Sequence, residues 1–242
     1  MLYAYLDETG QESKNWVFIA GFLGNEDQWR KFAPAWREAL GPQRKSLHMS
    51  ELRFKKEREK RLLERLGPIP VSCGLDPMVV GVRVSDYADL VGDNPLLKQV
   101  HCGYVIAVQV LTCQALRVIP PTERLELIFE EQRVYSSLVD IAMRYLSVQA
   151  DGYVATRDGK PKLAKCSYVP KISTCLIEPA DYFAYAMGQY HKDKTSRRTQ
   201  WCMPILRSVD AVHPIGALST KEQTRILITA MNAKLKQEGL LK

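Results

Sequence analysis

Apolar runs and polar breaks alternate over the first forty residues of the chain. Apolar residues 2–6 and 16–23 flank a polar stretch, and this pattern predicts a β-hairpin that opens the fold. Beyond Gly24 the sequence offers a helix start, and large apolar residues then recur at helical spacing until Gly41. These residues are Trp29, Phe32, Trp36 and Leu40. The spacing predicts a helix whose aromatic stripe packs into the core.

A strongly charged segment follows at residues 51–66. It combines seven Lys or Arg with four acids and ends at Gly67. Two interpretations stay open, a solvated helix with many ion pairs or a helix that contacts phosphates. Residues 70–84 have the pattern of one or two β segments, and the stretch at 79–84 is rich in β-branched residues.

The rest of the chain interleaves helical and strand patterns. Helical periodicity covers residues 95–119, 136–148, 177–190 and 220–238. Strand patterns cover residues 125–129 and a hairpin at 153–170. This alternation predicts an α/β fold. At 242 residues with 46% hydrophobic content, we expect a single domain over residues 1–242, with a helical insertion at about 26–66 and a C-terminal helix.

Composition narrows the setting in which the protein works. The formal net charge of +7 suits a polyanionic partner such as nucleic acid, or forms a solvated basic surface. No secretory signal is visible, and no window approaches the roughly 20 apolar residues of a membrane helix. The six cysteines include no Cys-x-x-Cys pair, so neither a zinc knuckle nor a disulfide framework is expected. We therefore expect a soluble, cytoplasmic protein.

Carboxylates follow two of the predicted strands. Asp7 and Glu8 end the first strand, and Glu130 ends a later one. A later helix carries Glu178 and Asp181 three residues apart on one face. Converging carboxylates repel one another, and a hard divalent cation such as Mg²⁺ or Mn²⁺ relieves that repulsion by taking oxygen ligands. Two such ions roughly 3.5 to 4 Å apart can activate water and stabilise the leaving oxygen of a phosphodiester.

The helix around Asp181 has little bulk beside the acid. Small residues surround it at Ala180, Ala184, Ala186 and Gly188, which lets the helix pack close to the sheet. A buried Asp is costly unless a cation or a hydrogen bond compensates it. These features favour a functional acid over a surface charge.

Five short segments of the chain carry a family resemblance. They are Tyr-Leu-Asp-Glu-Thr-Gly at 5–10, Trp-Val-Phe-Ile-Ala-Gly-Phe at 16–22, Leu-His-Met-Ser-Glu at 47–51, Ile-Phe-Glu-Glu at 128–131 and Leu-Ile-Glu-Pro-Ala-Asp-Tyr-Phe-Ala-Tyr at 176–185. In this order they resemble the domain of unknown function family 3800 (DUF3800). That family has an opening Asp-Glu-Ser-Gly, a central strand ending in an acid, and a late Gln-x-Ala-Asp-x-x-Ala-Tyr helix. The resemblance spans about residues 2–190.

The resemblance implies a ribonuclease H-like fold, with a mixed central sheet flanked by helices, and metal-dependent nuclease activity. Carried over residue by residue, it assigns Asp7 as the first-strand metal ligand, Glu130 as the second-strand acid and Asp181 as the helix acid. Glu8 and His48 are expected to support catalysis. His48 either handles a phosphate or a proton, or hydrogen-bonds a loop.

The chain departs from the family pattern at three positions. Thr9 stands where Ser is usual, Glu130 where Asp is common, and Glu178 where Gln is usual. Glu in place of Asp lengthens one ligand by a methylene group. Glu178 shares a helix face with Asp181 and joins the expected metal ligands.

We therefore expect a Mg²⁺- or Mn²⁺-dependent phosphodiesterase that acts on RNA, DNA or a hybrid. Basic clusters at 53–61 and 192–198 either straddle the nucleic acid or keep the protein soluble. One alternative is a nucleic-acid- or partner-binding module that has lost turnover. Another is a haloacid-dehalogenase-like phosphotransferase, in which Asp7 would be the nucleophile and a second Asp is usual at the position of Thr9.

Overall fold

The structure is a computed structural model that describes residues 1–9, 15–92, 97–98, 102–131, 140, 143, 156–170, 174–216 and 219–239. In this part of the chain, five strands form one mixed sheet in the order β3-β2-β1-β4-β5. The strands are β1 (Leu2–Thr9), β2 (Trp16–Asn25), β3 (Asp76–Arg83), β4 (Leu125–Glu130) and β5 (Leu163–Val169). β1 pairs antiparallel with β2 and parallel with β4; β2 pairs antiparallel with β3, and β4 parallel with β5.

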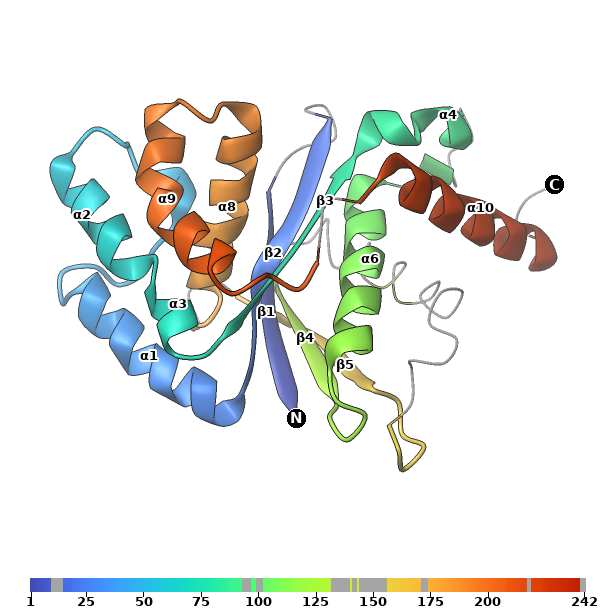
Figure 1. Cartoon of the computed structure of the whole chain (residues 1–242), viewed down its shortest axis with the longest axis horizontal. Helices are drawn as coiled ribbons and strands as arrows, with labels where there is room; N and C mark the ends of the chain where they lie inside the picture. Colours follow the sequence, from blue (N-terminus) through green and yellow to red (C-terminus); the bar gives the residue numbers. More distant parts are fainter. Residues whose placement is uncertain are drawn as a thin grey trace.

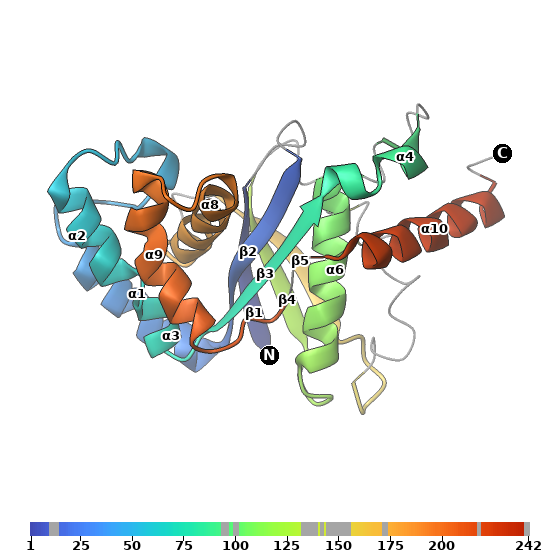
Figure 2. The same ribbon diagram turned by 45° about the horizontal axis from the view of Figure 1, so that its top comes forward.

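The helices lie in two layers, one on each face of the sheet (Figures 1 and 2). The layer at the left of Figure 1 contains α1 (Glu26–Leu40), α2 (Glu57–Leu66), α3 (Ile69–Ser72), α8 (Glu178–Lys192) and α9 (Arg197–Asp210). The layer at the right contains α4 (Ala88–Val91), α6 (Gly103–Val118) and α10 (Lys221–Gln237). Two 3-10 turns, η2 (Met49–Glu51) and η3 (Val84–Asp86), complete the described elements. The chain is thus an α/β fold with a mixed sheet flanked by helices, as expected.

Strand alternation gives the sheet two apolar faces. Ala4 and Leu6 of β1 belong to the core cluster that includes α6. Tyr3 and Tyr5 pack against the other cluster, which includes residues of α1 and α8. Successive side chains of a strand point to opposite faces, so odd-numbered residues of β1 face α8 and even-numbered ones face α6.

The opening elements match the expectation from the apolar pattern. The two apolar runs form the antiparallel pair β1–β2, with Leu2 opposite Asn25 and Thr9 opposite Phe18. Helix α1 begins at a capping box in which Asn25 and Gln28 each accept from the other's backbone N–H. Its aromatic stripe is buried as expected: Trp29, Phe32, Trp36 and Leu40.

Several predicted boundaries were wrong. The charged segment is helical only from Glu57, because the chain between η2 and α2 passes through Phe54 at a φ of 52°. Residues 69–72 form the short helix α3 where a β segment was expected. Helix α9 was not predicted. It contains Pro204, and its N-cap residue Ser196 lies in a segment interpreted only as basic. The later strand is confirmed as β4 and the two last helices as α8 and α10.

Two expected elements lie mostly outside the described residues. The helix at 136–148 and the first arm of the hairpin at 153–170 fall there, while the second arm of that hairpin is β5. The long helix expected at 95–119 is described from Gly103 to Val118 as α6.

All six cysteines are free thiols. Burial raises the pKa of Cys166 and of Cys202 to about 12, so both thiols are protonated at neutral pH. Among the helices that the structure describes, none is both long enough and apolar enough to cross a bilayer.

Candidate active site

Two of the expected acids end neighbouring strands on the same face of the sheet. In the parallel pair β1–β4, Leu6 lies opposite Phe129, and both belong to the core cluster on the α6 side. Asp7 and Glu130 each follow these residues by one position, so both carboxylates point to the face covered by α8. Adjacent strands are separated by about 4.8 Å. Asp7 is buried, with Oδ1 accepting the N–H of Glu8 at 2.9 Å, whereas Glu130 is half-buried.

Helix α8 lies close to this face. A Cβ added at Gly188 would lie 2.9 Å from Cγ2 of Thr9, so glycine permits the approach. Tyr5 lies near Cys175, just before the helix, and Thr9 lies against Gly188 near its end. Helix α8 and β1 therefore run in the same direction.

The stripe of α8 that faces β1 carries the third acid. Asp181 and Ala184 precede Gly188 by seven and four residues, so the three share one side of the helix. At about 1.5 Å per helical residue and about 3.3 Å per strand residue, Asp181 lies within about one strand residue of the level of Asp7. The fold thus directs acids from β1, β4 and α8 toward one end of the sheet.

A short polar chain connects Asp181 to the surface. Its Oδ2 accepts the backbone N–H of Met49 at 2.9 Å and lies 3.1 Å from Nδ1 of His48. Nε2 of His48 lies 3.0 Å from Oγ of Ser50, which is exposed. Sequence reasoning selected His48 but missed Ser50, because a serine in an exposed turn has no distinguishing pattern.

Glu178 faces a different set of partners. Its Oε2 accepts the indole N–H of Trp36 at 2.8 Å and the backbone N–H of Leu47 at 3.0 Å. Burial raises the pKa of Glu178 above its usual value, although both hydrogen bonds act in the opposite direction. Two adjacent turns of α8 therefore hold the segment 47–49, one through Glu178 and the other through Asp181.

Glu8 does not share the site face. It alternates with Asp7 along a regular strand, so its side chain points to the α6 side. The adjacent acids therefore cannot bind one ion together in this conformation of β1. Across the described ranges, no three His, Cys, Asp or Glu side chains form a group that could hold a metal ion.

The donor chemistry nevertheless fits a hard divalent cation. Asp7, Glu130 and Asp181 all offer carboxylate oxygens, which Mg²⁺ and Mn²⁺ prefer. Mg²⁺ keeps several water ligands, so one or two protein carboxylates suffice to bind it with substrate phosphates. Asp7 and Glu130 are two such carboxylates on neighbouring strands.

The outer end of the site opens into a hollow of about 660 Å³. Its lining includes Thr9, Ser50, Trp16, His191 and Arg198. Thr9 follows Asp7 by two residues on β1, and Ser50 contacts His48. The basic cluster at 192–198 lies beside this hollow, through Lys192 and Arg198. The sequence pattern indicated the basic cluster but did not indicate that Trp16 and Phe18 of β2 line the same hollow.

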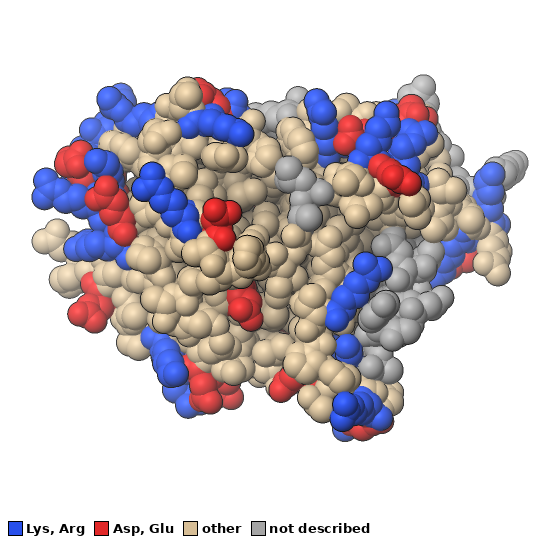
Figure 3. All heavy atoms as spheres, viewed as in Figure 1, with Lys and Arg blue, Asp and Glu red and all other residues tan. Residues whose placement is uncertain are grey.

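The other basic cluster is interspersed with acids. Lys60 lies 3.6 Å from Glu57 and 3.8 Å from Glu64 on α2. Figure 3 shows Lys and Arg mixed with Asp and Glu over this helix, at the left. These ion pairs agree with the ion-paired interpretation of the charged segment 51–66, of which Glu57–Leu66 is helical.

Comparisons of the chain with models of known families, with curated proteins and with solved structures gave no match.

Proposed function

We propose that the protein is a Mg²⁺- or Mn²⁺-dependent phosphodiesterase that acts on nucleic acid. The observation that carries this proposal is that Asp7 and Glu130 follow paired residues of the neighbouring strands β1 and β4 and share the sheet face covered by α8, the helix that carries Asp181. The strand order and the mix of parallel and antiparallel pairs support the finer proposal of a ribonuclease H-like fold. The net charge of +7 favours a polyanionic substrate.

Asp7 and Glu130 would hold the cation from the sheet, and Asp181 would approach it from α8. The bound ion would activate a water molecule and stabilise the leaving oxygen. The contacts of Oδ2 of Asp181 with Nδ1 of His48 and with the N–H of Met49 would hold the carboxylate in one orientation. We assign Glu178 an anchoring role, since its Oε2 is held by Trp36 and Leu47.

The direct test is a cleavage assay on the purified wild-type protein. Labelled single-stranded, duplex and hybrid RNA and DNA are incubated in EDTA, Mg²⁺ or Mn²⁺, and cation binding is measured by calorimetry in parallel. Cleavage that requires the cation supports the proposal. A phosphoenzyme trapped on Asp7 would favour the haloacid-dehalogenase-like alternative instead.

One specific observation favours a second candidate. Asp181, His48 and Ser50 form a chain in which the carboxylate lies at Nδ1 and the hydroxyl at Nε2. A Ser-His-Asp triad has this arrangement, with serine as the nucleophile of acyl transfer. The second candidate is therefore an esterase-like hydrolase centred on Ser50.

Ser50→Ala separates the two candidates. In the phosphodiesterase the substitution removes one hydrogen bond to His48, so we expect metal-dependent cleavage to fall by less than about tenfold. In a triad hydrolase it would remove the nucleophile and lower activity by about 10⁴-fold or more. The measurement is cleavage of labelled nucleic acid beside hydrolysis of a chromogenic ester. Labelling of Ser50 by a fluorophosphonate probe would establish the second candidate.

A further inference from the structure

The hollow beside the acids has an aromatic wall. Trp16 and Phe18 are alternate residues of β2 on the α8 face, and their rings stack with centroids 5.6 Å apart and 13° between planes. The ring of His191, from the end of α8, lies 5.4 Å from Trp16 and 4.8 Å from Phe18. Phe18 is fully buried, whereas Trp16 and His191 are partly exposed. The wall therefore offers π-faces to a ligand.

The ring of His191 is uncharged at neutral pH. Burial, and then the nearby ammonium of Lys194, lower the pKa of His191 below its usual value of 6.5. A neutral imidazole stacks on a base without introducing a charge into the wall. The aromatic surface is thus continuous from β2 to α8.

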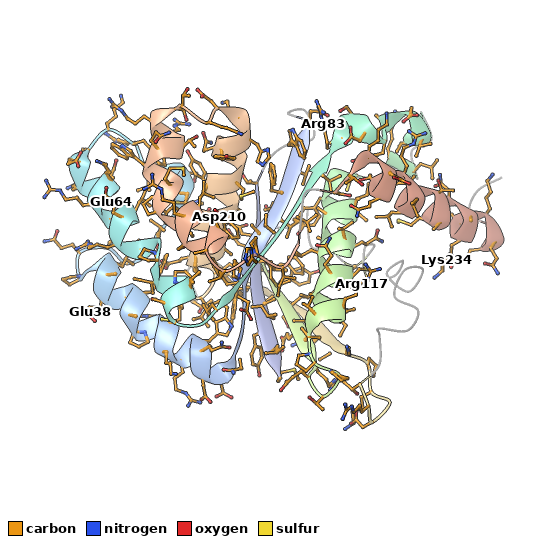
Figure 4. All side chains as sticks on the ribbon, viewed as in Figure 1. Glu38, Glu64, Arg83, Arg117, Asp210 and Lys234 are labelled. Carbon is orange, nitrogen blue, oxygen red and sulfur yellow. The ribbon has the colours of Figure 1, made fainter. Side chains whose placement is uncertain are left out.

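Basic side chains line the hollow and lie beside it. Lys192 and Arg198 are exposed and belong to its lining, which contains no Asp or Glu among the described residues. The guanidinium of Arg83 lies 5.9 Å from the centroid of Trp16, and Figure 4 labels it at the end of β3. The ammonium of Lys194 lies 4.8 Å from the ring of Tyr190, beside the same end of α8. A ligand with a flat apolar face and a negative charge complements this surface.

The hollow has the size and position for a nucleotide next to the proposed catalytic acids. Its volume of about 660 Å³ lies within the range of roughly 300 to 1,000 Å³ of small-molecule sites. Thr9 follows Asp7 by two residues, and Ser50 connects to Asp181 through His48. A strand whose phosphate reaches the acids would bring a neighbouring base to the aromatic wall.

We propose that this hollow binds an unpaired nucleotide of single-stranded nucleic acid, with the base on Trp16 and His191 and a phosphate at Lys192 and Arg198. This inference rests on the proposed function for the identity of the chain bound at the acids. Stacked bases inside a duplex cannot present a face to a side chain, so the geometry selects a single strand over a duplex.

The test measures the affinity for nucleic acid under conditions that prevent metal-dependent cleavage. Fluorescence anisotropy in EDTA follows a labelled single strand of about ten nucleotides and the matching duplex. Trp16→Ala is expected to weaken single-strand binding roughly 5- to 150-fold, the range for loss of one stacked base. Trp16→Phe keeps an aromatic face and should restore most of the affinity. If Trp16→Ala folds poorly, His191→Ala removes another ring of the aromatic wall at a partly exposed position and should also weaken single-strand binding.

The contribution of Lys192 to phosphate binding can be tested against a matched lysine variant elsewhere on the protein. Lys192→Ala should lower the salt dependence of binding by about 0.7 in the slope of log K against log salt, the value for one phosphate of a single strand. Lys236, an exposed lysine of α10 on the opposite layer, gives the control Lys236→Ala, which should leave the slope unchanged.

Either of two results would overturn the inference: folded Trp16→Ala and His191→Ala that bind single strands as the wild type does, or a duplex bound more tightly than the single strand. A free nucleoside monophosphate that binds as tightly as the oligonucleotide would overturn it in favour of a mononucleotide ligand. Cleavage is measured separately in Mg²⁺ and Mn²⁺. Single-strand binding through the hollow without cleavage by any metal would support this inference while refuting the proposed function.

Discussion

Asp7→Asn is expected to abolish metal-dependent cleavage, by at least about 10³-fold, and to leave the fold intact. A cation acting as Lewis acid contributes several kcal/mol to the transition state, and about 4 kcal/mol corresponds to a factor of 10³. The Asn side chain keeps an oxygen that can accept the N–H of Glu8, as Oδ1 of Asp7 does at 2.9 Å. The measurements are single-turnover cleavage of a labelled substrate and calorimetric titration with Mn²⁺.

Glu8→Gln is the matched control, because it removes the neighbouring charge on the same strand. Its side chain points to the opposite face of the sheet, so cleavage and Mn²⁺ affinity should remain within about threefold of the wild type. Equal losses in the two variants would show that charge at this end of β1, rather than one ligand, governs activity. Such a result would contradict the assignment of Asp7.

The same pair of variants addresses the binding-module alternative. If the wild type binds nucleic acid but cleaves none with any cation, Asp7 has no catalytic role and the binding-module alternative is favoured. Loss of cleavage in Asp7→Asn with unchanged nucleic-acid affinity would instead exclude the module, since the basic residues that supply affinity are untouched.

The elements that carry the site were accessible from the sequence. Period-two and helical patterns predicted β1, β2, α1 and α8 because each buries a clear apolar face. The opposite directions of Asp7 and Glu8 could also have been predicted, since strand alternation separates adjacent residues. Two adjacent acids suggest one shared ion on charge alone, but strand alternation directs their side chains to opposite faces.

Long-range contacts were beyond the sequence pattern. Trp36 and Glu178 are 142 residues apart, and no local periodicity indicates that an indole in an aromatic stripe donates to a buried carboxylate. The chain between η2 and α2 depends on the positive φ of Phe54, a conformation that bulky residues rarely adopt and that no propensity predicts. The hollow required α8, α9 and β2 to be placed together.

Glu178→Ala is expected to destabilise the protein by about 2 to 6 kcal/mol. The substitution leaves the N–H groups of Trp36 and Leu47 without their acceptor, and each buried unsatisfied donor costs about 1 to 3 kcal/mol. Glu178→Gln keeps an oxygen for both donors and should cost less than about 1 kcal/mol at acidic pH. Urea denaturation of the three proteins, followed by tryptophan emission, gives the free energies of unfolding.

The pH dependence of the same variants tests the state of the carboxyl group. Burial raises the pKa of Glu178 above 4.5, so its protonated form is favoured in the folded protein. The stability that this provides is present at low pH and is lost as pH rises through the raised pKa. Glu178→Gln does not titrate at this position. Its stability relative to the wild type should therefore increase between about pH 4 and about pH 7.

Metal binding by Glu178→Gln decides between an anchor and a ligand. As an anchor, Glu178 acts through Oε2 on the segment that also carries His48, and Gln keeps an oxygen for this contact. The Mn²⁺ affinity of the variant should therefore remain within about threefold of the wild type. Loss of a residue that supports a metal ligand typically lowers metal affinity 10- to 100-fold. A folded Glu178→Gln protein that no longer binds Mn²⁺ would make Glu178 a ligand. The contacts to Trp36 and Leu47 would then have to break when the cation binds. The stability difference between Glu178→Ala and the wild type would also grow in saturating Mn²⁺, because only the wild type would be stabilised by the bound ion.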